Sequence, residues 1–121
     1  MEEAKTIITD IDGTILYHHG SLEDIRNNEP ILLEKVKDRF DEWISKDYVI
    51  VIMTARPESF REETEQTLDK FGLKYHSLLM GMSHGERIII NDQKSYNGWE
   101  DRVSCSAIEV KRNGGFADLN I

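Results

Sequence analysis

The sequence predicts an α/β fold, a Rossmann-like three-layer sandwich in which helices cover both faces of a mainly parallel sheet. Apolar, strand-like runs alternate along the chain with segments of helical periodicity, which is typical of such folds. The run over residues 48–53 is continuously apolar, as expected for a strand buried on both faces. Right-handed crossovers bring the carboxyl ends of parallel strands to one edge, where open α/β sheets bind their ligands.

The size and charge of the chain restrict the classes of protein to which it can belong. Its 121 residues, 39% of them hydrophobic, suffice for one core, and we expect residues 1–121 to form a single domain. The net charge of −8 opposes binding to nucleic acid or anionic membranes. The single cysteine, Cys105, suits a reducing compartment. Without a signal-peptide pattern or an apolar run near the about 20 residues of a membrane helix, we expect a cytoplasmic protein.

In the first third of the chain the residue pattern predicts a strand, a loop and a helix. An apolar, β-branched run predicts a buried strand over residues 6–11, and turn-forming residues predict a flap loop over residues 13–29. A helix is expected to begin near Pro30, because proline suits a first helical turn. Its apolar positions follow helical spacing and are Ile31, Leu32, Leu33, Val36, Phe40, Trp43 and Ile44.

The rest of the chain predicts one more helix between strands. Residues 58–71 have a helical pattern, and Gly72 is a plausible stop. Their stripe facing the core is Phe60, Thr64, Leu68 and Phe71. Further strands are predicted over residues 74–80, 86–91 and 103–110, and residues 111–121 are expected to form a turn and a loose C-terminal tail.

Polar residues that follow three of these strands predict a site. Asp10 and Asp12 lie one residue apart at the end of the first strand, where i and i+2 side chains share a face and two like charges need a cation or a shared proton. Thr54 and Asp92 end two later strands. Singly, each residue suits a turn or a helix cap, but their ordered occurrence predicts a cluster of hard oxygen ligands suited to Mg²⁺.

These motifs resemble those of the haloacid dehalogenase (HAD) superfamily. The run Asp10-Ile11-Asp12-Gly13-Thr14 after a hydrophobic strand resembles the first motif of that superfamily. The strand that ends in Thr54-Ala55-Arg56 is similar to the second motif, and Ile88-Ile89-Ile90-Asn91-Asp92 to the fourth. The resemblance covers residues 5–95, and the short chain is similar to small members that lack a cap domain.

The resemblance implies a Mg²⁺-dependent phosphomonoester hydrolase. Asp10 would be the nucleophile that forms an aspartyl-phosphate, and Asp12 would be the general acid and then the base. Mg²⁺ would be held by Asp10, the backbone carbonyl of Asp12 and Asp92, and would offset charge repulsion. The implied substrate is a phosphorylated small molecule, with a sugar phosphate as the preferred class. The residues expected to contact it are Gly13, Thr54, Ala55 and Arg56.

The third motif of the superfamily, a lysine or less often an arginine, has no direct counterpart at the corresponding position of this chain. The corresponding dipeptide is Gly81-Met82, and no lysine occurs between Lys74 and Lys94. Arg87 is expected to supply the charge, with His84 and Lys74 as alternatives. The missing lysine keeps open a second interpretation, a HAD-fold binding or regulatory protein with weak or lost catalysis.

A phosphoacceptor signalling receiver is a third interpretation that we ranked last. Its acceptor aspartate would be needed near the position of Thr54.

Because the chain has no room for a cap domain, the site is expected to be open. An open site suits a homo-oligomer in which a neighbouring subunit covers it.

Overall fold

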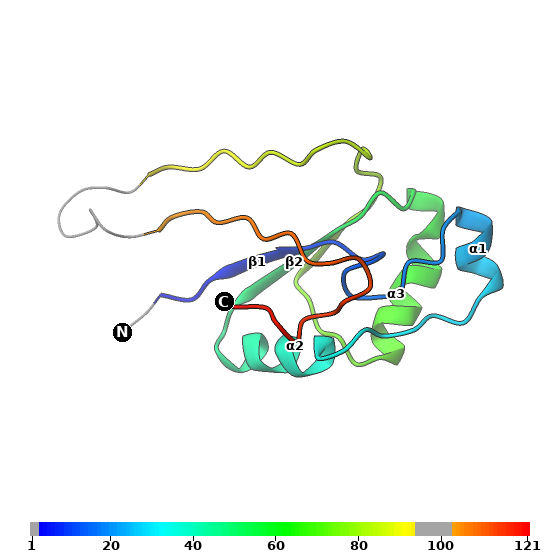
Figure 1. Ribbon diagram of the computed structural model, residues 1–121, viewed down its shortest axis with the longest axis horizontal. Coiled ribbons are helices and arrows are strands. Elements are labelled where there is room, and N and C mark those ends of the chain that lie inside the picture. Colours follow the sequence, from blue (N-terminus) through cyan, green and yellow to red (C-terminus); the bar gives the residue numbers. More distant parts are fainter. Residues whose placement is uncertain (1–2, 94–102) are drawn as a thin grey trace.

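The computed structural model describes residues 3–93 and 103–121 and is a small α/β fold (Figure 1). Its three-stranded parallel sheet has the order β1-β2-β3. The strands are β1 (Thr6–Thr9), β2 (Val49–Met53) and β3 (Ser77–Leu79). The helices are α1 (Leu22–Asn27), α2 (Val36–Ser45) and α3 (Arg61–Lys70), and α3 continues directly from the 3-10 turn η1 (Glu58–Phe60).

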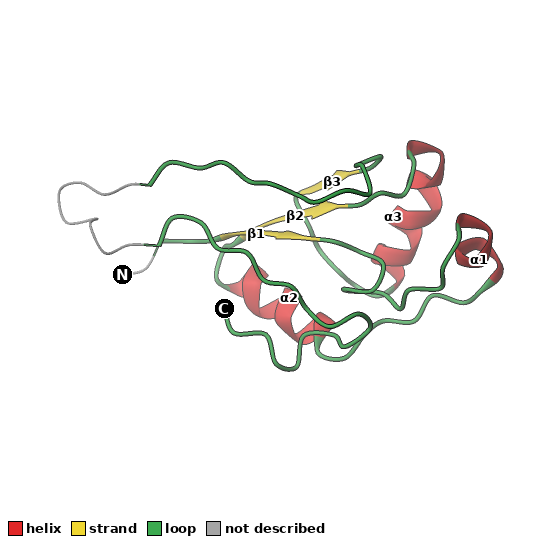
Figure 2. Ribbon diagram, turned by 45° about the horizontal axis from the view of Figure 1, so that its top comes forward, coloured by secondary structure: helices red, strands yellow, loops and turns green. Residues whose placement is uncertain are grey.

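Helices α2 and α3 form the crossovers that parallel pairing requires, α2 between β1 and β2 and α3 between β2 and β3 (Figure 2). The order of the strands across the sheet is the same as their order in the chain. Right-handed crossovers therefore place both helices on the same face. On that face Ile50 and Ile52 are 0% exposed, and Leu78 is 7% exposed. The core therefore lies between one face of the sheet and the two helices.

Aromatic side chains fill the part of the core under α2. The ring of Trp43 lies 5.5 Å from that of Phe40 and 5.7 Å from that of Phe116, centroid to centroid. Phe116 belongs to the C-terminal tail, so the prediction of a loose end is wrong. The tail can approach α2 because Gly115 has a φ of 70° and packs against the backbone of Glu34, where a Cβ atom would collide.

Two predictions for the N-terminal third need correction. The expected flap loop contains the helix α1, whose N-cap Ser21 forms a capping box with Asp24. The expected helix at Pro30 begins only at Val36. Residues before it are held extended, because Leu32 forms an antiparallel bridge with Leu16 and the Leu33 N–H donates to the Ile15 carbonyl at 3.0 Å.

The central elements agree better with the sequence. The predicted helix over residues 58–71 is formed by η1 and α3, and Gly72 follows it with a φ of 70°. The short strand predicted over residues 74–80 is β3. In contrast, β2 is buried on one face only, since Ile50 and Ile52 are covered while Val49 is 41% exposed. A continuous apolar run alone cannot distinguish one covered face from two.

The strands predicted over residues 86–91 and 103–110 are not formed. These residues lie in two extended segments, 83–93 and 103–111, which we call the arm; it runs from the carboxyl end of the sheet back past its amino end (Figure 1). Among the described residues, no backbone hydrogen bond joins the segments, and the Asn91 side chain donates to the Ser104 carbonyl at 2.7 Å. Without a paired backbone, an extended segment is not a strand. Within the described ranges no helix is long and apolar enough to cross a membrane.

Candidate active site at the carboxyl end of the sheet

A tight loop after β1 carries the two aspartates of the first motif. The Ile11 carbonyl accepts hydrogen bonds from the N–H groups of Thr14, Ile15 and Leu16 at 3.0, 2.9 and 3.1 Å. Gly13 has a φ of 88°, which favours glycine, and its N–H donates to the Leu16 carbonyl at 2.7 Å. Since Ile11 and Ile15 are fully buried, this loop is anchored to the core on either side of Asp12.

Arg56 holds the carboxylate of Asp12 in a two-point ion pair. Its Nε donates to Oδ2 at 2.9 Å and its Nη2 donates to Oδ1 at 2.8 Å. The third guanidinium nitrogen, Nη1, donates to the hydroxyl of Thr64 on α3 at 3.0 Å. The Arg56 side chain is 7% exposed and that of Asp12 is 19% exposed. The pair is thus largely removed from water, where bidentate geometry makes an ion pair strong and directional.

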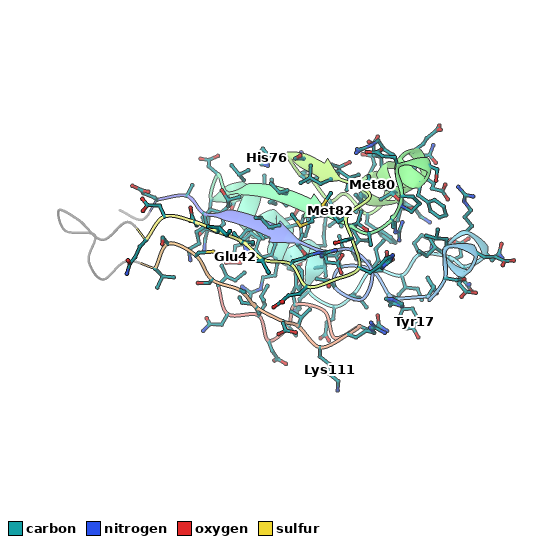
Figure 3. The ribbon with its side chains drawn as sticks, turned by 90° about the horizontal axis from the view of Figure 1, so that it is seen from above. Tyr17, Glu42, His76, Met80, Met82 and Lys111 are labelled. Atoms are coloured by element: carbon teal, nitrogen blue, oxygen red, sulfur yellow. The ribbon has the colours of Figure 1, made fainter. Side chains whose placement is uncertain are left out.

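Thr54 fixes the backbone that presents Arg56. Its hydroxyl accepts a hydrogen bond from the Arg56 N–H at 3.1 Å. Its N–H donates to the Leu79 carbonyl at 2.9 Å, and its carbonyl accepts from the Met82 N–H at 2.9 Å. These bonds place Met82 at the carboxyl end of the sheet (Figure 3). Thr54 itself is 1% exposed, so its hydroxyl supports the site from inside the fold and is covered in this conformation.

Asp10 pairs with the residue expected to replace the lysine. Nη1 of Arg87 lies 3.3 Å from Oδ1 of Asp10, and the two side chains are 36% and 35% exposed. Asp10 and Asp12 therefore each have their own arginine, which offsets the negative charge of the carboxylate it contacts. The Asp10 pair is open to solvent, whereas the Asp12 pair is mostly covered.

The remaining expected residues differ in where they lie. Gly13 is buried in the loop after β1, and Ala55 is half-buried between Thr54 and Arg56. Asp92 is exposed near the described end of the first arm segment. In residues 3–93 and 103–121 no three aspartate, glutamate, histidine or cysteine side chains form a group that could hold a metal, so Asp92 is not gathered with Asp10 and Asp12. Its role as a ligand stays a prediction.

The fit of Mg²⁺ to the site depends on the groups around Asp10. Mg²⁺ in proteins keeps several waters and needs only one or two carboxylates. The Asp10 carboxylate is one-third exposed, and in the described part of the chain no hydrogen bond uses the Asp12 carbonyl. These two oxygen donors fit a largely hydrated Mg²⁺, whereas the Asp12 carboxylate is occupied by Arg56.

A polar cavity of about 440 Å³ adjoins Arg56. It lies between the loop after the first motif, α1 and α3. Amide, hydroxyl and aromatic side chains line it, among them Tyr17, Asn27, Asn28, Gln66 and Thr67. Its volume is within the range of small-molecule sites, about 300–1,000 Å³. Two charged pairs flank it, and the hydrogen bonds from Arg26 lower the pKa of Glu63.

Two supporting residues were missed in the sequence. Thr64 lies on the apolar stripe of α3, where its position predicts packing, but its hydroxyl binds Arg56. The signal in the sequence was a threonine within an otherwise apolar stripe; the structure shows it 0% exposed, where a hydroxyl needs a partner. Asn113 was interpreted as part of a turn, yet its N–H donates to the Gly13 carbonyl at 2.8 Å and its side chain accepts from the His18 N–H at 2.7 Å. No local pattern indicates that contact.

Comparisons with known proteins support the fold but do not indicate a function. No protein-family model and no curated protein matches the chain. A chain in a structure of a Pnkp1/Rnl/Hen1 complex is similar over 69% of this chain, with 24% identity and a TM-score of 0.57. The chain spans 30% of the length of that relative. A structural-genomics target from Vibrio cholerae is similar over 79% of this chain and 85% of its own length, with 22% identity and a TM-score of 0.51.

Proposed function

We propose that the chain is a Mg²⁺-dependent phosphomonoester hydrolase of the HAD type that acts through an aspartyl-phosphate. The observation that carries this proposal is the pair of motif aspartates with separate arginines, Asp10 with Arg87 and Asp12 with Arg56. Asp10 is partly open to solvent, as a nucleophile that meets a substrate must be, and Asp12 is held in a fixed orientation two residues away.

In the proposed reaction an oxygen of Asp10 attacks phosphorus, and the bond from phosphorus to the leaving oxygen breaks. Asp12 must enter this step protonated; it gives that proton to the leaving oxygen, then takes a proton from the water that hydrolyses the acyl phosphate and frees Asp10. Arg56 aims the Asp12 carboxylate by two hydrogen bonds, and each carboxylate oxygen keeps a lone pair for the proton. Arg87 supplies positive charge beside Asp10, where the phosphate would sit.

The proposed metal ion would be held by the Asp10 carboxylate and the Asp12 carbonyl, with Asp92 as the further ligand that the resemblance implies. When bound, Mg²⁺ offsets the repulsion between the nucleophile and the phosphate dianion. Arg87 and Arg56 provide two positive charges beside the same region.

The polar cavity, which Arg56 lines but Asp10, Asp12 and Arg87 do not, is the place we propose for a polar leaving group. Amides and hydroxyls in its wall can donate to and accept from an alcohol, and Tyr17 offers an aromatic surface. A sugar phosphate is the substrate class we propose first. The proposal includes the finer fold class, a Rossmann-like three-layer sandwich, whose third layer would have to cover the second face of the sheet.

A second candidate is a HAD-fold binding or regulatory protein with weak or lost catalysis. Two observations favour it: Thr54, expected to contact phosphate, is 1% exposed, and Met82 stands where a lysine is expected. Both would lower turnover without preventing phosphate or metal from binding.

The deciding experiment measures phosphate release from a panel of sugar phosphates, nucleotides and an aryl phosphate, with and without Mg²⁺. Wild type is compared with Asp10→Asn and with the matched control Asp38→Asn, whose side chain is 73% exposed on α2. We expect Mg²⁺-dependent release that Asp10→Asn abolishes and Asp38→Asn retains. Folded wild-type protein that releases no phosphate from any compound would rule out hydrolysis of these classes and favour the second candidate.

A further inference from the structure

One face of the sheet has no cover from its own helices. By the strand register, Ile8, Val51 and their neighbours point to the face opposite the core. The open sheet face, as we call it, consists of Thr6, Ile8, Val49, Val51, Met53, Ser77 and Leu79. Ile8 is 43% exposed, Val49 41% and Leu79 39%. Parallel sheets occur almost always with both faces covered, so this face lacks a layer.

The arm carries the second set of exposed apolar side chains. Ile88 is 75% exposed, Ile90 94% and Val103 79%. The arm lies on the side of the sheet opposite α2 (Figures 1 and 2), which is the side of the open sheet face. The chain's own arm therefore faces the sheet but leaves both surfaces exposed to water. Exposed apolar side chains gathered on one side of a fold mark an interaction site.

We propose that the open sheet face and the arm together form the contact surface between two copies of this chain. Charge supports a second copy as the occupant: none of the seven residues of the open sheet face is charged, in a chain with 31% charged residues and a net charge of −8. Two copies with this net charge repel each other over most of their surfaces, and an uncharged face is where that repulsion is weakest.

The arm and the open sheet face suit each other as contact surfaces, which also supports a second copy of the chain as the partner. The arm offers extended apolar segments, and the sheet offers an uncovered apolar face with β1 as an edge strand. Because each copy has both surfaces, a two-fold arrangement covers both in each copy at once, as an isologous interface does. A foreign partner would have to supply both surfaces itself.

The contact would also stabilise the candidate site. The arm begins next to Met82, which is bonded to Thr54, and ends two residues before Asn113, which is bonded to Gly13. Arg87, the partner of Asp10, lies in the arm directly before Ile88. A second copy that holds the arm therefore also holds Arg87 beside Asp10. This surface does not depend on the proposed hydrolysis, and its test does not use activity.

Sedimentation equilibrium of the full chain tests the proposal. At about 100 µM, above the Kd of a micromolar dimer, we expect a species of twice the 14.0 kDa chain mass. Ile90→Asp places a charge at a side chain that is 94% exposed, so the fold is retained, and it should raise the dimer Kd by about tenfold or more. Val49→Lys should do the same from the sheet face.

The matched control is Ile31→Asp, at a 50% exposed apolar residue outside both surfaces, which should leave the mass unchanged. Circular dichroism confirms that each variant is folded. A wild-type protein that stays monomeric at this concentration overturns the proposal, including the case in which it then binds a different protein. So does a dimer that Ile90→Asp and Val49→Lys leave as tight as before.

Discussion

Arg56 and Asp12, 44 positions apart in the sequence, meet in a two-point ion pair with donor–acceptor distances of 2.8 and 2.9 Å. The pair joins the loop after β1 to the loop after β2, and Thr64 extends the connection to α3. It therefore ties together the elements that surround the candidate site. The arrangement makes Arg56 a positioning residue for Asp12.

Removing the arginine should destabilise the fold strongly. Arg56→Ala leaves the Asp12 carboxylate partly buried without a partner, and we expect the free energy of unfolding to fall by about 3 kcal/mol, as for other broken buried pairs. The measurement is urea unfolding. The control is Lys37→Ala, which breaks an ion pair with Asp41 whose side chains are 44% and 59% exposed and should cost less than about 1 kcal/mol. Equal losses in the two variants would contradict this account.

The C-terminal tail should depend on a single glycine. Gly115→Ala forces an L-residue to a φ of 70° and drives its Cβ into the backbone of Glu34. We expect a loss of about 2–4 kcal/mol in the free energy of unfolding, from left-handed strain together with overpacking. Gly85→Ala is the matched control, since nothing lies within 4 Å of its added Cβ. A Gly115→Ala protein as stable as wild type would show that the tail does not pack there.

The helix α1 should weaken in acid. Hydrogen bonds from the backbone and side chain of Ser21 lower the pKa of Asp24 below its ordinary value of 3.8. A folded-state pKa below the unfolded value means that the stabilisation is present above pH 3.8 and is lost as the pH falls through the lower, folded-state pKa. NMR chemical shifts of residues 22–27 should show α1 fraying over that range. In Ser21→Ala, α1 should be less ordered already at neutral pH; an identical acid response in both proteins would exclude the capping box as the cause.

Local patterns predicted the parts of the site that lie within a few residues of each other. Asp10 and Asp12 follow one strand, and Thr54 and Arg56 follow the next. An apolar run that ends in polar residues is therefore enough to locate them. Arg87 comes directly before Ile88 at the start of a predicted strand, which made it the expected source of the charge, and it lies 3.3 Å from Asp10. The pairing of Arg56 with Asp12 could not be predicted, because which partner a guanidinium reaches depends on how two distant loops pack.

The same reason explains the differences in the fold. Residues 31–33 have helical spacing, but pairing of Leu32 with Leu16 competes with the helix and prevails. Phe116 follows two glycines, which predict a loose end, yet the pocket beside Trp43 buries it. The isoleucines of the arm predict a strand, and the described chain provides no neighbouring strand to pair with them. In each case a contact between distant segments decided the outcome.

The arginine beside Asp10 gives the sharpest test of the proposed chemistry. Arg87→Met removes the charge next to the nucleophile, and we expect kcat/KM for the best phosphate ester to fall about 100-fold. The free energy of unfolding should change by less than about 1 kcal/mol, because both side chains of the pair are about one-third exposed. Lys111→Met, which removes a charge elsewhere in the arm, should leave both quantities unchanged.

Met82→Lys in the Arg87→Met background should restore part of the rate, since Met82 is bonded to Thr54 at the same edge of the sheet. If Arg87→Met and Lys111→Met are equally active, Arg87 is a surface residue and the charge that a phosphate needs must come from elsewhere.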